Sequence, residues 1–215
     1  MFINIHTHSE IFDAKVELVS LNVDEEARPN LYSYGIHPWK IKKDSEDDLV
    51  ELNRVCRNRR CIAVGECGLD KTIDADFNLQ QKIFTEHILI ANELDKPLVI
   101  HCVKAFNELI TCLKKTKNKV PVIIHGFNNN LNIANDLIKE GFILSFGKAL
   151  LTFDSNASEA IKHVGRKNFF LETDDSDVSI KYIYKKAAEL LSIDEEILRE
   201  QLVSNYQRIF KEEIL

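Results

Sequence analysis

Short apolar runs that end in polar residues recur along the chain and predict buried β-strands. Runs of β-branched and aliphatic residues bounded by Gly, Pro and polar residues are typical of parallel strands covered on both faces. We therefore expect eight strands, over Phe2–His6, Val16–Asn22, Leu31–Ile36, Cys61–Glu66, Pro97–His101, Val120–His125, Phe142–Phe146 and Asn168–Thr173.

Segments of helix length, with apolar residues at three- and four-residue spacing, lie between the later strands. The predicted helices are Asp44–Arg57, Asp76–Leu94, Glu108–Lys115, Leu131–Glu140, Ser155–Val164, Ile180–Leu191 and Glu195–Phe210. This alternation predicts the α/β class and, with eight strands, a (β/α)8 TIM barrel. The gaps Ser9–Lys15 and Val23–Asn30 are too short for a crossover helix with its loops. The barrel should therefore be abbreviated or distorted around its first two βα units.

Composition narrows the class of protein. A length of 215 residues, 45% of them hydrophobic, with no repeat or linker, predicts a single domain over residues 1–215. The 28 basic and 34 acidic residues give a formal charge of −6, which excludes a broad basic surface for nucleic acid. The sequence shows no membrane span or secretory signal, so we expect a cytoplasmic protein without a membrane partner. Five cysteines without C-x-x-C spacing are expected to be reduced.

Residues with the chemistry of metal ligands stand at the ends of five apolar runs. Because α/β barrels place their active sites where the carboxyl ends of the strands meet, these side chains should converge. An isolated H-x-H pair could equally be two satisfied strand-end histidines, but ligand-type residues at five strand ends favour a metal site. A nearby cation would also keep a buried glutamate charged. The candidate ligands are His6, His8, Glu66, His101, His125 and Asp174.

Several motifs in combination resemble the TatD family of metal-dependent hydrolases and deoxyribonucleases, which belong to the amidohydrolase-like barrels. They are His6-Thr7-His8, Gly35-Ile36-His37-Pro38, Gly65-Glu66-Cys67-Gly68-Leu69-Asp70, Gln80 with Phe84, Pro97 to His101, His125-Gly126-Phe127 and Glu172-Thr173-Asp174. The resemblance covers nearly the whole chain. It implies a deoxyribonuclease that hydrolyses phosphodiesters with metal-activated water.

The resemblance also implies roles for the candidate ligands. His6, His8, Glu66 and Asp174 would hold one divalent metal, Glu66 would bridge to a second ion, and His101 and His125 would complete the second site. Catalysis would rest on Glu66 and on Asp174, the general base. Two ions are expected, and the mixed nitrogen and oxygen donors suit Zn, Mn, Mg, Ni or Fe alike.

The chain departs from the family pattern where a phosphate would be bound. Lys104 stands in a segment where DNA-hydrolysing members tend to have an Arg, and the basic loop after the E-T-D motif is replaced by Asp175-Ser176-Asp177. Arg clamps orient phosphodiesters, so their loss weakens the nuclease interpretation without affecting the metal chemistry. The partner could therefore be DNA or a small phosphate ester, ester or amide. A catalytically weak metal-binding scaffold is a further alternative.

Two residues are candidates for substrate contact, each beside a structural alternative. His37 could contact substrate or only stabilise a turn, and Lys104 could contact a phosphate or only be solvated. Trp39 could be a stacking platform for a base, although a lone Trp after a turn is more often packed against the barrel rim. The sequence leaves the oligomeric state open.

Overall fold

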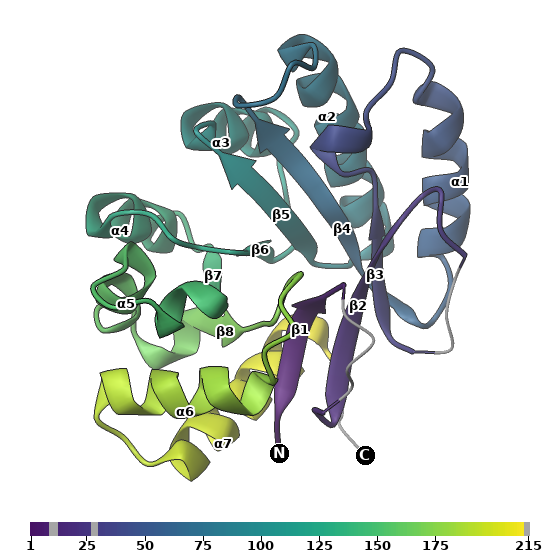
Figure 1. Ribbon diagram of the computed structural model, residues 1–215. Helices are drawn as coiled ribbons and strands as arrows, with labels where there is room; N and C mark the ends of the chain where they lie inside the picture. The colour runs from purple at the N-terminus through teal and green to yellow at the C-terminus, as the bar shows by residue number, and fades with distance from the viewer. Residues whose placement is uncertain (9–12, 27–29, 213–215) are drawn as a thin grey trace. The chain divides into compact units, whose positions relative to one another are not determined.

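The computed structural model describes residues 1–8, 13–26 and 30–212, and it contains eight strands in these residues (Figure 1). The strands are parallel and follow the order of the sequence in one sheet, with helices between the later ones. This is the topology of a (β/α)8 TIM barrel, as the sequence predicts. The strands are β1 (Ile3–Thr7), β2 (Val16–Asn22), β3 (Tyr32–Gly35), β4 (Cys61–Asp70), β5 (Leu98–Val103), β6 (Val122–Ile124), β7 (Ile143–Phe146) and β8 (Phe169–Leu171).

The helices of the described residues lie close to their predicted bounds. Most begin at a polar residue whose side chain accepts a hydrogen bond from the first helical turn, such as Asp76 before α2 and Ser179 before α6. The α-helices are α1 (Glu46–Cys56), α2 (Phe77–Leu94), α3 (Phe106–Lys115), α4 (Leu131–Lys139), α5 (Asn156–Ile161), α6 (Ile180–Leu191) and α7 (Glu195–Phe210). Three short 3-10 helices were not predicted: η1 (Pro38–Lys40), η2 (Lys148–Leu151) and η3 (Arg166–Asn168).

Strand β4 is longer than the sequence analysis predicts, since it runs through Asp70 rather than ending at Glu66. The reason is its pairing with β5, which shifts register between Val64 and Cys67 and then continues to Asp70 and Val103. Gly68 permits this close approach, because its φ is +140° and an added Cβ would lie 2.0 Å from the carbonyl oxygen of His101. The G-E-x-G-L-D motif is therefore part of a strand and not of the loop after it.

The connections after β1 and β2 bear out the abbreviated start of the barrel. Residues 8, 13–15, 23–26 and 30–31, the described parts of these connections, contain no helix, and the remainder of both lies outside the described residues. Among the helices that the structure describes, none combines the length and apolar character of a membrane span.

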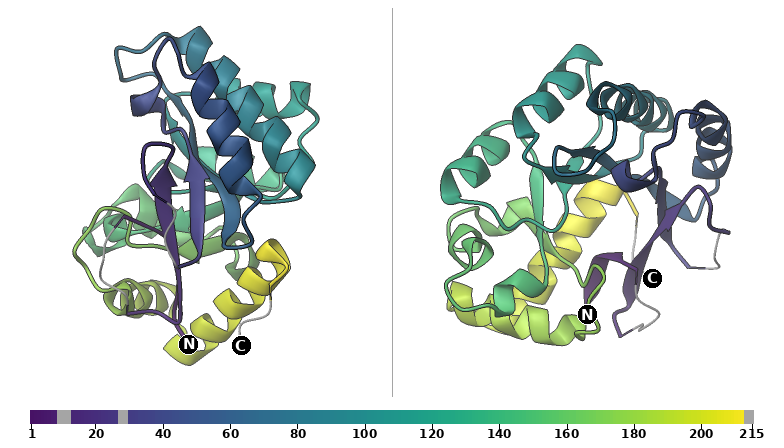
Figure 2. Two further views of the ribbon diagram at one scale, coloured as in Figure 1. Left: turned by 90° about the vertical axis from the view of Figure 1, so that its right-hand side faces the viewer. Right: turned by 45° about the horizontal axis from the view of Figure 1, so that its top comes forward.

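The chain divides into two compact units. The first comprises Met1–Val19 with Ile123–Leu215, and the second comprises Ser20–Val122. In the first unit α6 and α7 pack together (Figure 2). The hydroxyl of Tyr184 on α6 donates to the carbonyl of Ile3 on β1 at 3.0 Å. In the second unit α1 and α2 lie side by side over β4. That residues 1–215 form a single domain stays a prediction.

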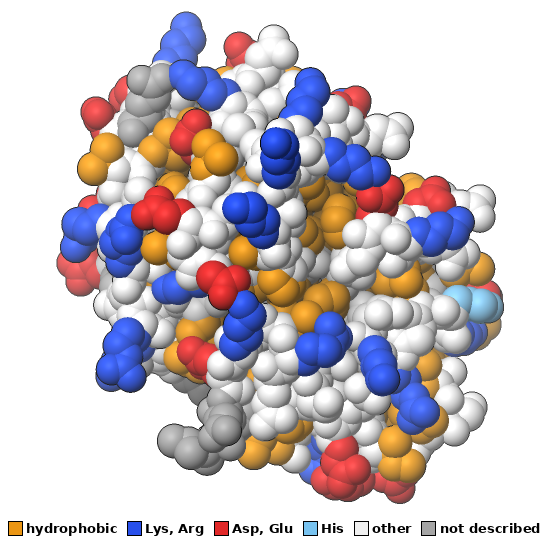
Figure 3. All heavy atoms as spheres, turned by 180° about the vertical axis from the view of Figure 1, so that it is seen from behind, with side chains coloured by type: hydrophobic (Ala, Val, Ile, Leu, Met, Phe, Trp, Pro, Cys, Tyr) orange, Lys and Arg blue, Asp and Glu red, His pale blue; other side chains and the backbone are white. Residues whose placement is uncertain are grey.

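The distribution of charged side chains on the surface agrees with the nearly balanced numbers of basic and acidic residues. Basic and acidic side chains are interspersed on the face drawn in Figure 3, with no continuous basic field there.

The strands are almost entirely buried. All five cysteines are buried and carry free thiols, as expected for a reduced protein: Cys56, Cys61, Cys67, Cys102 and Cys112.

Candidate metal centre

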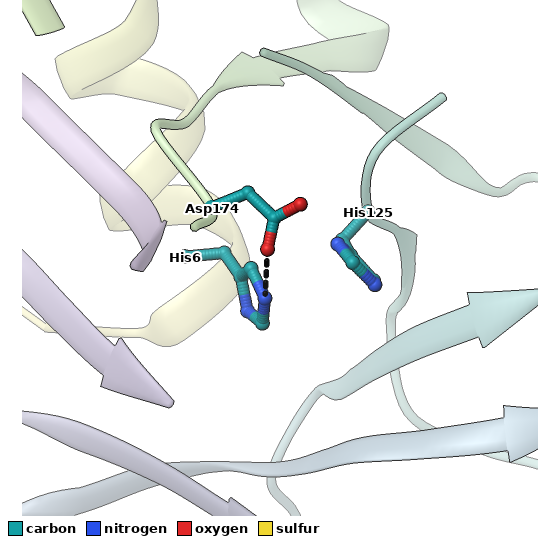
Figure 4. A group of neighbouring side chains, drawn as sticks. All are labelled: His6, His125 and Asp174. Carbon is teal, nitrogen blue, oxygen red and sulfur yellow. Dashed lines mark ion pairs between the residues drawn. The ribbon is translucent and has the colours of Figure 1, made fainter. Parts of the chain in front are cut away.

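The first unit brings three of the predicted ligands together. His6 comes from β1, His125 follows β6 and Asp174 follows β8, and one ligand atom from each lies within 4.8 Å of the others (Figure 4). The Nε2 atom of His6 is 3.6 Å from Oδ1 of Asp174, and the rings of His6 and His125 are 4.2 Å apart between centroids. The Nε2 atom of His8 is 3.9 Å from the same Asp174 oxygen.

Backbone contacts place Asp174 beside His6 on β1 and His8 directly after that strand. Its amide donates to the carbonyl of His6 at 3.0 Å, and its carbonyl accepts from the amide of His8 at 2.9 Å. Asp174 has a φ of +54°, a left-handed conformation that non-glycine residues adopt rarely and often at functional sites. The turn after β8 therefore directs this carboxylate toward the His6 and His8 side chains.

The first cluster, His6, His8, His125 and Asp174, fits a divalent cation. Its nitrogen-to-oxygen distances of 3.6 and 3.9 Å exceed those of hydrogen bonds, which span roughly 2.7–3.2 Å. Two ligands held at roughly 2.0–2.2 Å by one tetrahedral ion lie roughly 3.3–3.6 Å apart. Imidazole and carboxylate are also the mixed donors that zinc, manganese and iron accept.

Glu172 is a buried carboxylate beside His125 that the sequence analysis did not assign to the site. The Glu172 side chain is fully buried, and its Oε1 accepts from the amide of Gly126 at 2.6 Å and lies 3.5 Å from Nδ1 of His125. A carboxylate behind an imidazole commonly fixes the orientation of a metal-binding histidine. The signal was present in the sequence, because Glu172 opens the E-T-D motif.

The second unit contains another cluster, formed by His37, Glu66 and His101. One ligand atom from each lies within 4.8 Å of the others. Oε1 of Glu66 is 3.0 Å from Nε2 of His37 and 3.2 Å from Nδ1 of His101. The Glu66 side chain is only 5% exposed, so its charge requires compensation nearby.

The hydrogen bonds of His37 show that it orients Glu66. Its Nδ1 accepts from the amide of Trp39 at 3.1 Å, so a neutral ring must carry its single proton on Nε2. That proton points to Glu66 at 3.0 Å. His37 thus donates to a candidate ligand, and its predicted contact with substrate stays a prediction.

We assign the opposite tautomer to His101 from the carboxylate that faces its Nε2. Its Nε2 lies 3.2 Å from Oδ2 of Asp70. Burial alone would raise the pKa of Asp70, but hydrogen bonds from Thr72, Trp39 and His101 lower it to about 2. The charged carboxylate keeps the proton on Nε2, so the Nδ1 lone pair faces Glu66. A cation between these two acceptors would remove their repulsion, so this cluster also fits a metal.

Asp70 is the main site residue that the sequence analysis missed. It lies four residues after Glu66 on β4, so both side chains share one face of the strand. Gln80 on α2 fixes the end of the strand, because its Oε1 accepts from the amide of Asp70 at 2.8 Å and its Nε2 donates to the carbonyl of Asp70 at 3.0 Å.

Lys148, which the sequence analysis did not consider, balances the negative charge of Asp175 next to Asp174 of the first cluster. Lys148 on η2 pairs with Asp175, and this hydrogen bond raises the pKa of Lys148. The pair reduces the repulsion that Asp175 would exert on an anionic substrate. Lys104 follows β5 with a φ of +55° and is exposed, and its role in substrate binding stays a prediction.

Comparison with known proteins identifies the family. A model of the family described as TatD related DNase matches residues 2–211. The chain belongs to this family. An uncharacterized metal-dependent hydrolase from Buchnera aphidicola subsp. Baizongia pistaciae is 30% identical over 197 residues, which cover 84% of this chain and 74% of the relative. The uncharacterized metal-dependent hydrolase YabD of Bacillus subtilis is 27% identical over 194 residues, covering 82% and 76%.

A solved TatD structure confirms the fold class. The crystal structure of YjjV, a TatD homolog from Escherichia coli K12, has a TM-score of 0.79 with 21% identity and covers 91% of this chain and 87% of its own. The TatD-family chain is therefore a metal-dependent hydrolase with a TIM-barrel fold. Its individual ligands and the bridging role of Glu66 stay predictions.

Proposed function

We propose that this TatD-family hydrolase is a divalent-metal-dependent deoxyribonuclease in which Asp174 acts as the general base. The observation that carries the proposal is the first cluster, where His6, His125 and Asp174 come within ligand distance of one another from three different strand ends. A solvent-accessible carboxylate beside a metal can both ligate the ion and accept a proton. The Asp174 side chain is 29% exposed, which leaves it accessible to water.

We assign the following roles in metal binding and proton transfer to the residues of the two clusters. His6, His8, His125 and Asp174 of the first cluster would hold one ion, and Glu66 and His101 of the second cluster would hold another. Bound ions would supply Lewis-acid polarisation of the phosphoryl group and lower the pKa of a water molecule. The Asp174 carboxylate, whose Oδ1 faces His6 and His8, would accept a proton from the attacking water through its other oxygen. His37 would hold Glu66 through the hydrogen bond between Nε2 and Oε1.

A second candidate is the same chemistry on a small phosphate ester, ester or amide. The absence of an Arg beside His101 favours it, since Lys104 cannot make the bidentate contact of a guanidinium with a phosphodiester. Neutralisation of Asp175 by Lys148 instead supports an anionic substrate. We prefer DNA because the matched family is described as TatD related DNase. A scaffold without turnover stays the third possibility.

Hydrolysis assays test the proposal. A single-stranded oligodeoxynucleotide and a generic phosphodiester would each be incubated with Mg²⁺, Mn²⁺, Zn²⁺ or chelator. We expect metal-dependent DNA cleavage that falls about 10²- to 10⁴-fold in Asp174→Asn and is lost in Glu66→Ala. Asp177→Asn, at a nearby exposed position, is the matched control and should retain activity. Cleavage of the small diester alone would support the second candidate, and no turnover with any metal would support the scaffold.

A further inference from the structure

Trp39 is an exposed tryptophan that is nevertheless held in one orientation. The residue is 66% exposed and lies on η1, directly after the end of β3. Its indole Nε1 donates to Oδ2 of Asp70 at 2.9 Å, and its backbone amide donates to Nδ1 of His37 at 3.1 Å. Because Asp70 itself is only 1% exposed, the indole is tied to a fixed and buried anchor.

The indole lies beside the second cluster. The ring of His37 is 5.0 Å from that of Trp39 at an interplanar angle of 88°, and the ring of His101 is 6.0 Å away at 76°. These two ring contacts and the Nε1 hydrogen bond leave 66% of the residue exposed. The large exposed fraction must therefore come from the rest of the ring, which faces solvent next to candidate metal ligands.

We propose that the exposed indole of Trp39 stacks on a nucleobase adjacent to the scissile phosphodiester and so selects substrates that carry bases. Stacking on aromatic side chains is the general means by which proteins bind single-stranded nucleic acid, and it tolerates any base because each has a π-face. The hydrogen bond to Asp70 fixes the ring in advance, so little side-chain entropy is lost on binding. The inference rests on the proposed function, since it names the part of the substrate that this site holds.

A merely structural role for Trp39, limited to holding Asp70, predicts a different pattern of variants. Trp39→Phe and Trp39→Leu both remove the Nε1 donor, but only Trp39→Phe keeps an aromatic face. If Trp39 only holds Asp70 through its hydrogen bond, both variants should bind metal and DNA equally poorly. If it stacks on a base, Trp39→Leu should bind DNA more weakly than Trp39→Phe while their metal affinities agree.

The chain offers a direct optical readout, because Trp39 is its single tryptophan. An oligothymidylate would be titrated into the metal-loaded Asp174→Asn variant while tryptophan fluorescence is recorded, with an abasic strand of equal length as the matched probe. We expect quenching by the oligothymidylate and none by the abasic strand. Equal responses to both strands would overturn the proposal.

Labelled oligothymidylate measures the affinity of the variants by anisotropy. Stacking of one base is worth roughly 1–3 kcal/mol, so Trp39→Leu should raise the Kd about 5- to 150-fold relative to Trp39→Phe. The abasic strand should show no such difference. Equal Kd values for the two variants would reject stacking.

The binding measurements test the stacking of Trp39 separately from the proposed deoxyribonuclease activity. Quenching together with an absence of cleavage by the native chain would leave the stacking platform standing and reject the deoxyribonuclease. Cleavage of DNA without quenching would support the deoxyribonuclease and reject stacking by Trp39.

Discussion

At the scale of single residues, the site is defined by where protons sit on two histidines. Nδ1 of His37 accepts from a backbone amide, whereas Nε2 of His101 faces the charged Asp70 carboxylate. The two rings therefore turn different atoms toward Glu66, one a donor and the other a lone pair. This difference explains why His101 suits a metal and His37 suits the support of a ligand.

Asp70→Asn should weaken metal binding. The amide cannot hold the proton on Nε2 of His101 with a negative charge, and loss of such a partner typically costs about 10- to 100-fold in metal affinity. Calorimetric titration with Zn²⁺ or Mn²⁺ measures the change. Asp74→Asn, at an exposed position four residues further on, is the matched control and should bind as the native chain does. Native affinity in Asp70→Asn would contradict the assigned tautomer.

At the scale of elements, helix α2 fixes the ends of two strands that carry site residues. Gln80 holds both backbone groups of Asp70 at the end of β4. About two turns further along α2 lies His87, which is fully buried. Its Nε2 accepts from the amide of Ile36, next to His37, at 2.9 Å. Its Nδ1 lies 2.8 Å from the carbonyl of Ile83. The sequence marks α2 as amphipathic, but the polar residues on its buried face are what position the site.

His87 should make the protein less stable at acidic pH. Burial lowers its pKa from 6.5 to about 4, so the unfolded chain binds a proton in this window and the folded chain does not. The contribution to stability is complete above about pH 6.5 and falls by about 3 kcal/mol as the pH drops through 4.

Urea unfolding at several pH values measures this dependence. His87→Gln keeps an acceptor for Ile36 but cannot titrate here, so its stability should depend less on pH than that of the native chain between pH 6.5 and 4. The matched control is His163→Gln, which replaces a half-exposed histidine and should retain the native slope. Identical slopes for His87→Gln and the native chain would refute a neutral buried His87.

At the scale of the whole molecule, each compact unit contains one cluster of ligand-type side chains. The first holds His6, His8, His125 and Asp174, and the second holds Glu66 and His101 with their partners His37 and Asp70. Ions that bind the folded chain and not the unfolded chain must stabilise it by mass action. Metal affinity should therefore be visible in global stability as well as in catalysis.

Divalent metal should raise the melting temperature. One site filled at 100 times its Kd contributes about 2.7 kcal/mol, which corresponds to about 5–10 °C for a chain of this size. Differential scanning fluorimetry in chelator and in Zn²⁺ or Mn²⁺ measures the shift. The shift should shrink in His6→Ala and remain in His163→Gln, and a melting temperature independent of metal would argue against both clusters as metal sites.

The sequence by itself determined the order of strands and helices, the barrel class and the set of candidate ligands. These follow from local patterns, because apolar periodicity sets each element, and polar residues at the carboxyl ends of parallel strands stand where barrels place their active sites. Only the tertiary structure decided which partner each polar group has: Asp70 for His101, Trp39 for Asp70, Lys148 for Asp175 and Ile36 for His87. The reason is physical, since these contacts join residues far apart in the chain, and their geometry depends on the register of strands and the packing of helices that no local pattern encodes.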